Sequence, residues 1–321
     1  MRIFATSAYS DTEPIESFLR LASHGTRHRL TTDVREADAI LFIENSRYHE
    51  DAFFSRLKRS RLVKQYRERC FMYNEHDRPW CVLPGVYCSM PRKWFSRRRQ
   101  RATRYIRLLN QVDTDTSDKP DILFSFLGNS HIPLRRSLLG LKNPRAIIED
   151  TSSFNAFFTR GKGIQHSRYA DVLRRSKFVL CPRGGGTSSI RLFETLYAGR
   201  VPIIISDEWV APDGPDWQTC SLNVRERDIS ELGQIVTDLE PRWPEMASAA
   251  TQVWKDWFCD KVLFDHIGDA LSAIALDRVI PESLAQRIPS VPEWDWRLRR
   301  GIRHSLSSAS KQLATRFGQR S

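Results

Sequence analysis

The chain has 321 residues, of which 40% are apolar and 27% charged, as expected of a globular protein with a sizeable core. Lysine and arginine outnumber aspartate and glutamate, and the net charge of +12 favours an anionic partner such as a nucleotide sugar, an acidic glycan, an anionic membrane surface or nucleic acid. No apolar run approaches the roughly 18–20 residues of a membrane-spanning helix. The first residues, MRIFATSAYSDTEP, lack the charged-then-apolar pattern of a secretory signal and predict a strand.

Six cysteines are scattered without a CxxC pair, at Cys70, Cys81, Cys88, Cys181, Cys220 and Cys259. This spacing argues against a zinc site. Because no secretory signal is recognised, we expect reduced and mostly buried thiols. A cytoplasmic protein fits best, with the cytosolic face of a membrane as a peripheral alternative.

The first part of the chain alternates between predicted strands and helices. Residues 2–5 and AILFIE (Ala39–Glu44) have the pattern of strands, and residues 13–22 that of a helix between them. Phe71–Tyr73 ends a further strand, and the polar residues Asn74 to Arg78 follow it. Ligands of open α/β sheets lie beyond the carboxyl ends of strands. This cluster is therefore a candidate site, with a plain polar turn before Pro79 as the alternative.

A basic run, Arg92–Arg107, contains six arginines after residue 96 beside Trp94 and Phe95. Such a run could hold an anionic glycan, a lipid headgroup or nucleic acid, or form a solvated helix face. No RNA-binding signature accompanies it, so nucleic acid is an unlikely partner. The polar stretch Asn110–Pro120 predicts a linker between residues 1–115 and a second lobe, residues 116–276.

The stretch SKFVLCPRGGGTSSIRLFETLYAGRVPIIISD (Ser176–Asp207) predicts a strand, a glycine turn, a helix and a second strand. A helix amino terminus behind a glycine turn is suited to an anion, because unpaired N–H groups and the helix dipole point at the ligand. Arginines add donors that match phosphate, and a carboxylate one turn into the helix could accept hydrogen bonds from ribose. The candidate residues are Arg183, Gly184, Gly185, Gly186, Thr187, Ser188, Ser189, Arg191 and Glu194. The alternative is an ordinary glycine-rich turn with surface arginines.

The spacing CPRG…RLFE…GRVPIIISD resembles the exostosin-type glycosyltransferases. The likeness continues through Trp217 and Val224–Leu232, and reaches upstream to Ile122–Leu139. It implies an α/β fold of GT-B type, with two Rossmann-like parallel-sheet lobes and a cleft between them. It also implies transfer of a sugar, with inversion, from a nucleotide sugar (a UDP-sugar favoured) to a glycan acceptor. Animal exostosins carry an amino-terminal membrane anchor, from which this sequence departs.

The resemblance also implies roles for individual residues. A loop before the helix that carries Arg135 and Arg136 would face the donor, so that either arginine could reach the diphosphate, unless both are surface arginines. Asp207 would lie near the donor sugar or a bound cation, unless it caps a helix. One of Glu75, His76, Asp77 or Asp207 would be the general base that an inverting transferase needs. No cation is expected to be obligatory, although some exostosin-type enzymes respond to manganese, so Mn²⁺ or Mg²⁺ stays open.

Two other functions stay open at this point. A fucosyltransferase using GDP-fucose shares the general pattern and differs in base recognition. A non-catalytic protein of the same fold could use its positive charge to bind glycans or other polyanions.

Helices are predicted over residues 228–239, 244–258 and 262–276. In the remaining segment, residues 277–321, apolar side chains recur at helical spacing from Trp294 to Phe317 among arginines and lysines. This pattern predicts a basic amphipathic helix, which could lie in a membrane interface or pack across the two lobes.

Overall fold

The computed structural model describes residues 1–9, 13–44, 51, 54–77, 81–110, 112, 119–153 and 164–286. Most of the predicted linker, Asn110–Pro120, and the predicted amphipathic helix from Trp294 to Phe317 lie outside the described residues.

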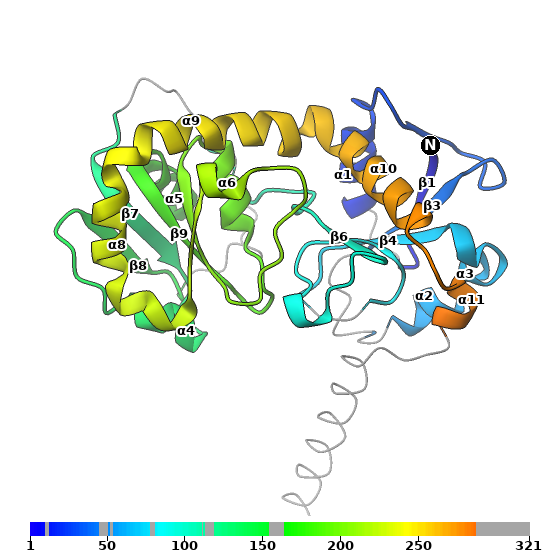
Figure 1. Cartoon of the computed structure of the whole chain (residues 1–321), viewed down its shortest axis with the longest axis horizontal. Helices are drawn as coiled ribbons and strands as arrows, with labels where there is room; N and C mark the ends of the chain where they lie inside the picture. The colour runs from blue at the N-terminus through cyan, green and yellow to red at the C-terminus, as the bar shows by residue number, and fades with distance from the viewer. Residues whose placement is uncertain are drawn as a thin grey trace, which may run out of the picture.

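The described chain forms two lobes, each built on a fully parallel sheet (Figure 1). The first sheet has the order β2-β1-β3-β4-β5-β6. Its strands are β1 (Arg2–Thr6), β2 (Arg29–Leu30), β3 (Ala39–Glu44), β4 (Cys70–Asn74), β5 (Gly85–Tyr87) and β6 (Gln100–Ala102). Every residue of β3 is buried, as expected of a strand covered on both faces.

The second sheet has the order β11-β10-β9-β7-β8. Its strands are β7 (Ile122–Gly128), β8 (Ala146–Asp150), β9 (Ser176–Pro182), β10 (Val201–Ile205) and β11 (Leu222–Val224). The two lobes therefore share one winding pattern: the first strand of each lies between its second and third. The predicted fold of two Rossmann-like α/β lobes is confirmed.

Short helices connect and cover these strands. In the first lobe they are α1 (Glu13–Ala22), α2 (Ser55–Arg59), α3 (Arg61–Gln65), η2 (Arg67–Arg69) and η3 (Arg92–Trp94). In the second lobe they are α4 (Pro133–Leu138), α5 (Ile164–Arg175), α6 (Ile190–Tyr197), α7 (Trp217–Cys220), η4 (Glu226–Glu231), α8 (Leu232–Leu239), η5 (Glu240–Arg242) and α9 (Trp243–Val253).

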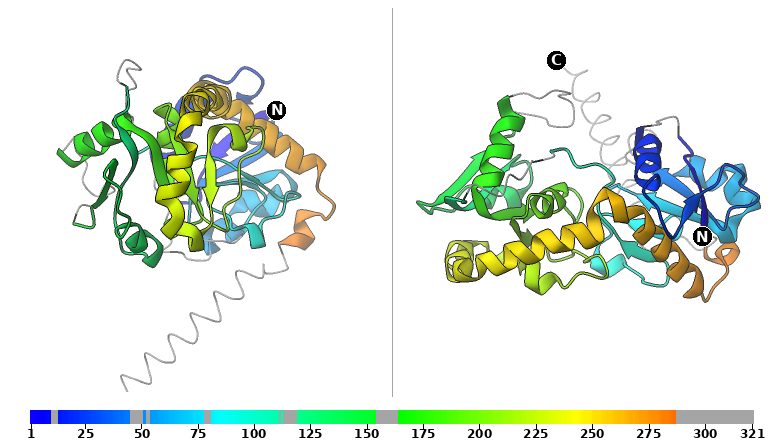
Figure 2. Two further views of the ribbon diagram at one scale, coloured as in Figure 1. Left: turned by 60° about the vertical axis from the view of Figure 1, so that its left-hand side comes forward. Right: turned by 90° about the horizontal axis from the view of Figure 1, so that it is seen from above.

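The chain returns from the second lobe to the first through one long helical run (Figure 2). Helix α9 packs on the second sheet, a π-helical turn, η6 (Trp254–Phe258), follows, and α10 (Asp260–Leu276) packs on α1 and β5. Helix α11 (Glu282–Ala285) then lies against η2. The predicted second lobe extended to Leu276, but the structure places α10 on the first lobe, so the change of lobe falls at η6.

Arg104 fixes this crossing from the first lobe. Its side chain is 1% exposed, and it donates to the carbonyl of Phe258 at 2.7 Å and to Oδ1 of Asp260 at 2.5 Å. The same guanidinium donates to the carbonyls of Tyr105 and Ile106. A single buried cation thereby binds both segments of chain that pass between the lobes.

The basic run is paired with carboxylates along its length. The pairs are Arg97–Asp213, Arg99–Glu282, Arg101–Asp277, Arg104–Asp260 and Arg107–Glu13. The run also forms η3 and β6 rather than a continuous helix, so the expectation of a solvated helix face is wrong. These arginines hold the lobes and the carboxyl-terminal helices together, which leaves little of their charge for a polyanion.

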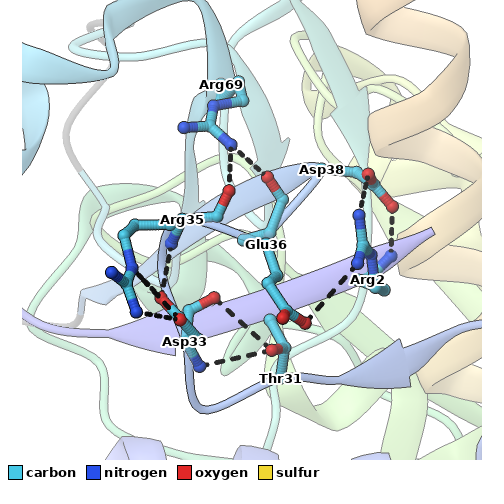
Figure 3. A network of polar contacts seen from close by, with 8 residues as sticks. Arg2, Thr31, Asp33, Arg35, Glu36, Asp38 and Arg69 are labelled. Carbon is cyan, nitrogen blue, oxygen red and sulfur yellow. Dashed lines mark hydrogen bonds and ion pairs between the residues drawn. The ribbon is translucent and has the colours of Figure 1, made fainter.

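A polar network lies at the amino ends of β1 and β3 (Figure 3). Arg2 pairs with Glu36 and Asp38, while Arg35 pairs with Asp33. Arg69 donates to the carbonyl of Ala37 at 2.6 Å. Because ligands of such sheets bind at the opposite, carboxyl ends, we assign this network to stability.

All six cysteines are free, and four of them are buried. Within the described residues, no group of three or more histidine, cysteine or acidic side chains could hold a metal ion. In the same part of the chain, no helix combines the length and apolar character required to cross a bilayer.

Candidate active site

The carboxyl ends of β7 and β9 meet where the strand order of the second sheet reverses. In doubly wound sheets, ligands bind outside the strands at this point. The chain leaves β7 through Asn129 and β9 through Arg183, and Arg135 of α4 spans the two exits. Arg135 donates through Nε to the carbonyl of Arg183 at 3.0 Å and through Nη1 to Oδ1 of Asn129 at 3.3 Å. The predicted glycine turn therefore lies at the place where this fold binds ligands.

Helix α6 starts directly after the turn, as the sequence predicts. Leu192, Phe193 and Leu196 bury its apolar face, and Gly199 ends it with a positive φ of 60°. Ser189 is the N-cap residue, but its side chain makes no capping hydrogen bond. The side chain of the N-cap residue therefore leaves the first N–H groups of α6 without a local cap.

The first lobe reaches the turn instead. Ser188 N–H donates to Oγ of Ser89 at 3.4 Å, and Ser89 hydrogen-bonds to the hydroxyl of Tyr105 at 2.9 Å. A Cβ on Gly185 would lie 3.1 Å from Oδ2 of Asp77. A Cβ on Gly186 would lie 2.6 Å from Oγ of Ser89 and closer still to Oδ1 of Asp77. Glycine is needed here because a side chain would collide with the opposite lobe.

The three predicted arginines have different partners. Arg183 forms a bidentate ion pair with Glu226, with Nε 2.6 Å from Oε1 and Nη2 2.9 Å from Oε2. Arg191 donates to the carbonyl of Leu127 and stacks 4.7 Å from the ring of Phe126. Neither Arg191 nor Arg135 has a carboxylate among the ion pairs of the described residues, whereas Arg183 does. The positive charge available to an anion therefore belongs mainly to Arg135 and Arg191.

The electrostatic environment of Arg135 supports this assignment. Burial and, after it, the nearby Arg191 lower the pKa of Arg135 to about 10, against the opposite effects of Asp77 and Tyr105. The side chain remains charged at neutral pH. A buried cation next to a second cation gains much from an anion placed between them.

Buried polar atoms without a protein hydrogen-bond partner gather at the turn. In the described part of the chain they include Oγ1 of Thr187, Oγ of Ser188, and Nε and Nη1 of Arg191, with Oγ of Ser206 at the end of β10. Buried polar groups are normally satisfied, so such a cluster points to a ligand with several acceptor oxygens.

Glu194 lies below the turn rather than at its surface. It is 2% exposed and accepts hydrogen bonds from Asn110 N at 2.7 Å, Asn110 Nδ2 at 3.1 Å and the hydroxyl of Tyr169 at 2.7 Å. Burial raises its pKa, and these donors partly offset the rise. The predicted ribose contact would require these hydrogen bonds to break, and it stays a prediction.

The four candidate bases differ in where their side chains lie. Glu75 accepts the amide N–H of Ile106 inside the first lobe, and burial raises its pKa to about 7. His76 is buried with its ring edge-on to Phe54. Asp77 is exposed and its carboxylate faces the glycine turn.

Asp207, the fourth candidate, accepts the N–H of Glu226 at 3.0 Å, at the start of η4. This is the capping role that the sequence left open as the alternative.

Three residues at this site were not predicted. Glu226 binds Arg183, and Ser89 and Tyr105 of the first lobe approach the start of α6. For Glu226 the sequence carries a signal, because this carboxylate follows the short strand β11 by two residues. A side chain in that place can reach the carboxyl ends of the neighbouring strands. For Ser89 and Tyr105 the sequence carries no signal, because they belong to the other lobe.

Residues 98–239 match the family model of the exostosin GT47 domain. A probable glycosyltransferase of Arabidopsis thaliana is 34% identical over 128 residues, which are 39% of this chain and 23% of that protein. An exostosin-1 homolog of Caenorhabditis elegans is 33% identical over 103 residues, 31% of this chain and 27% of the relative. The matches thus span about a quarter of the relatives' length.

Solved structures of glycosyltransferases are also similar to this chain. WaaG, involved in lipopolysaccharide biosynthesis, gives a TM-score of 0.39 at 12% identity and covers 85% of this chain and 99% of its own. HepE of Anabaena, solved with UDP, gives a TM-score of 0.41 at 10% identity and covers 85% of this chain and 100% of its own.

The fold and the site together define a two-lobed parallel α/β protein in which the glycine turn of the second lobe faces Asp77 and Ser89 of the first. Residues 98–239 match the exostosin GT47 domain, and the predicted resemblance of the central motif to that family is confirmed.

Proposed function

We propose that this protein is a glycosyltransferase that moves a sugar from a nucleotide-sugar donor to a glycan acceptor. The observation that carries the proposal is the cluster of buried, unpartnered hydroxyl and guanidinium groups at the start of α6. The exostosin GT47 match and the names of the relatives support glycosyl transfer as the reaction.

The donor diphosphate would bind between Arg135, Arg191 and the turn Gly184–Ser189. Guanidinium groups and backbone N–H groups stabilise the charge that grows on a leaving diphosphate, which is commonly the largest catalytic contribution. Arg183 would act indirectly, since Glu226 neutralises it and its carbonyl orients Arg135.

Asp77 would be the general base, because its carboxylate faces the turn from the opposite lobe. The acceptor oxygen attacks the anomeric carbon and transfers its proton to Asp77. The bond from that carbon to the phosphate oxygen breaks, and its electron pair leaves with the diphosphate. Attack from the face opposite the leaving group inverts the anomeric centre. Replacement of such a base is expected to slow transfer by about 10²–10⁴-fold.

A UDP-sugar is the proposed donor. One relative, a probable beta-1,4-xylosyltransferase of Arabidopsis thaliana, is 32% identical over 100 residues, 30% of this chain and 24% of its own. Its name supports a pentose or similar sugar as the group that is transferred. A GDP-sugar is the alternative, which a nucleotide panel would separate.

No obligatory cation is proposed, because Arg135 and Arg191 already supply positive charge beside the predicted diphosphate. Transfer should keep most of its rate in excess EDTA. A loss of more than about tenfold, restored by Mn²⁺ or Mg²⁺, would contradict this.

The cytoplasmic location and a peripheral membrane contact through the carboxyl-terminal tail stay predictions. A vesicle-binding measurement on the full chain and on a chain ending at residue 286 would test the contact.

The first experiment is thermal stability in the presence of UDP, GDP, CMP and their sugars. A ligand at about 100-fold over its Kd should stabilise the protein by roughly 2.7 kcal/mol. Arg135→Ala should abolish the shift, while Arg136→Ala, its exposed neighbour, should retain it. If no nucleotide shifts the melting temperature of the wild type, the proposed function is contradicted. If the shifts of the two variants are equal, the proposed site is contradicted.

A further inference from the structure

Two side chains of the first lobe cover the glycine turn of the second. The carboxylate of Asp77 lies against Gly185 and Gly186, and Oγ of Ser89 accepts the N–H of Ser188 at 3.4 Å. The first lobe thus places one anionic and one hydroxyl oxygen at the amino end of α6.

We propose that Asp77 and Ser89 occupy the phosphate position of this turn while no donor is bound, and that the donor diphosphate displaces them. This inference rests on the proposed function. It adds a competition within the protein, because contact between the lobes and donor binding use the same amino end of α6, including the N–H of Ser188.

The position is suited to an anion independently of Asp77. Helix α6 is eight residues long and directs its free N–H groups at the turn. Ser188 is 5% exposed, and its Oγ has no hydrogen-bond partner among the residues that the structure describes. Thr187 Oγ1 is likewise buried and unpartnered. Two hydroxyl donors at a helix amino end are the groups that a phosphate would use.

Asp77 and a phosphate cannot share the position. A Cβ on Gly186 would already collide with Oδ1 of Asp77, so the space above this residue is filled by the carboxylate. The two anions would also repel each other at short distance. The carboxylate lies near enough to Arg135 to oppose the lowering of its pKa, and a diphosphate would replace the carboxylate as the anion beside this guanidinium.

Ser89 is a positioning residue in this arrangement. The hydroxyl of Tyr105 holds it at 2.9 Å, and the ring of Tyr105 packs edge-on to Phe193 of α6, with centroids 6.4 Å apart. Ser89 therefore fixes where the first lobe contacts the turn. Because its hydroxyl is uncharged, it does not repel the donor diphosphate.

One consequence concerns the proposed base. While Asp77 covers the turn, its carboxylate is held away from an acceptor hydroxyl. Once the diphosphate takes the turn, the carboxylate is released beside the anomeric carbon. Binding of donor and exposure of the base are then a single event.

The test is calorimetric titration of the full chain with UDP and with inorganic pyrophosphate. Asp77→Asn keeps the shape of the side chain and removes its charge, so both ligands should bind about tenfold more tightly, or roughly 1.4 kcal/mol. Transfer by the same variant should fall, because the base is lost. Ser89→Ala should lower KM for the donor, because the Ser188 N–H then has no side-chain acceptor from the first lobe to exchange for a phosphate oxygen.

Asp213→Asn is the matched control, since it removes the Arg97–Asp213 and Arg101–Asp213 ion pairs between the lobes without changing a residue of the turn. An equal rise in ligand affinity in Asp77→Asn and Asp213→Asn would overturn the inference, because weaker contact between the lobes would explain both results. Unchanged or weaker binding by Asp77→Asn would overturn it and leave the proposed function intact. Absence of binding by the wild type and all variants would overturn both.

Discussion

Glu194 shows how a residue in the right motif can serve a different purpose from the predicted one. It accepts hydrogen bonds from the backbone and side-chain amides of Asn110, which precedes the second lobe, and from the phenol hydroxyl of Tyr169 in α5. Glu194→Ala would leave the amide of Asn110 unsatisfied in a buried position. We expect a loss of about 2–4 kcal/mol in the free energy of unfolding.

Urea unfolding of Glu194→Ala and Glu194→Gln measures this effect. The glutamine retains an acceptor for Asn110 and should lose less. Unchanged stability in the alanine variant, together with weaker nucleotide binding, would instead support the predicted ribose contact.

Glu44 should make the stability of the protein depend on pH. It is 2% exposed, and burial raises its pKa to about 7, although hydrogen bonds from the amide of Ala8 and the hydroxyl of Ser7 oppose the rise. Because the folded-state pKa exceeds the unfolded value of 4.5, the contribution is fully present below pH 4.5 and is lost as pH rises through 7. A rise of this size corresponds to about 3 kcal/mol.

Glu44→Gln should therefore stabilise the protein at pH 8 relative to the wild type and change little at pH 4.5. The measurement is the free energy of unfolding at both pH values. Glu16→Gln, at an exposed position on α1, is the control and should leave the profile unchanged. A Glu44→Gln profile parallel to that of the wild type would contradict the prediction.

At the scale of elements, Asp265 attaches α10 to the first lobe. It is 4% exposed and accepts the N–H groups of Thr26, Arg27 and His28. Burial alone would raise its pKa, but these hydrogen bonds outweigh burial and lower the pKa to about 2. The contribution of Asp265 to the free energy of unfolding is present above its unfolded-state pKa of 3.8 and is lost as pH falls through the folded-state pKa of about 2.

Asp265→Asn should cost about 2 kcal/mol at pH 7 and much less near pH 2. Hydrogen exchange should report faster exchange at residues 26–28 and along α10, while β7 to β11 remain protected. Equal acceleration in both lobes would contradict a local role for this contact.

Much of the element structure follows from local sequence patterns. Ala39–Glu44, Phe178–Cys181 and Val201–Ile205 are apolar runs of strand length, and each forms a buried parallel strand. The helix over Glu13–Ala22 was predictable from its apolar periodicity. These signals are local because the hydrogen bonds and the buried face belong to one short segment.

Contacts between distant segments could not be predicted in this way. Nothing near Gly186 indicates that Asp77 and Ser89 lie above it, since roughly a hundred residues separate them in the chain. The arginines of the basic run look free in the sequence, but their carboxylate partners come from as far away as Glu13 and Glu282. The residue types of the candidate site were therefore predictable, whereas the distant residues that pair with them were not.

At the scale of the whole molecule, Arg104 couples the two lobes. Its buried guanidinium satisfies three carbonyl oxygens and the carboxylate of Asp260. Arg104→Met would leave these acceptors without a donor, at a cost of about 3–5 kcal/mol. Arg97→Met, which removes an exposed guanidinium paired with Asp213, should cost less than about 1 kcal/mol.

Calorimetry would detect the coupling directly. The wild type should unfold in one transition, and Arg104→Met should unfold at lower temperature with the lobes melting separately. A single transition displaced equally in both arginine variants would contradict a coupling role.

The return of α10 to the first lobe also determines when this protein can complete folding during its synthesis. The sheet of the first lobe is finished at Ala102, but the helix that covers α1 and β5 begins only at Asp260, after the entire second lobe. At synthesis rates of about 5–20 residues per second, a ribosome needs on the order of ten seconds or more to cross that interval. The nascent first lobe must keep an apolar face shielded during this time. A chain truncated before α10 should accordingly depend on chaperones for solubility.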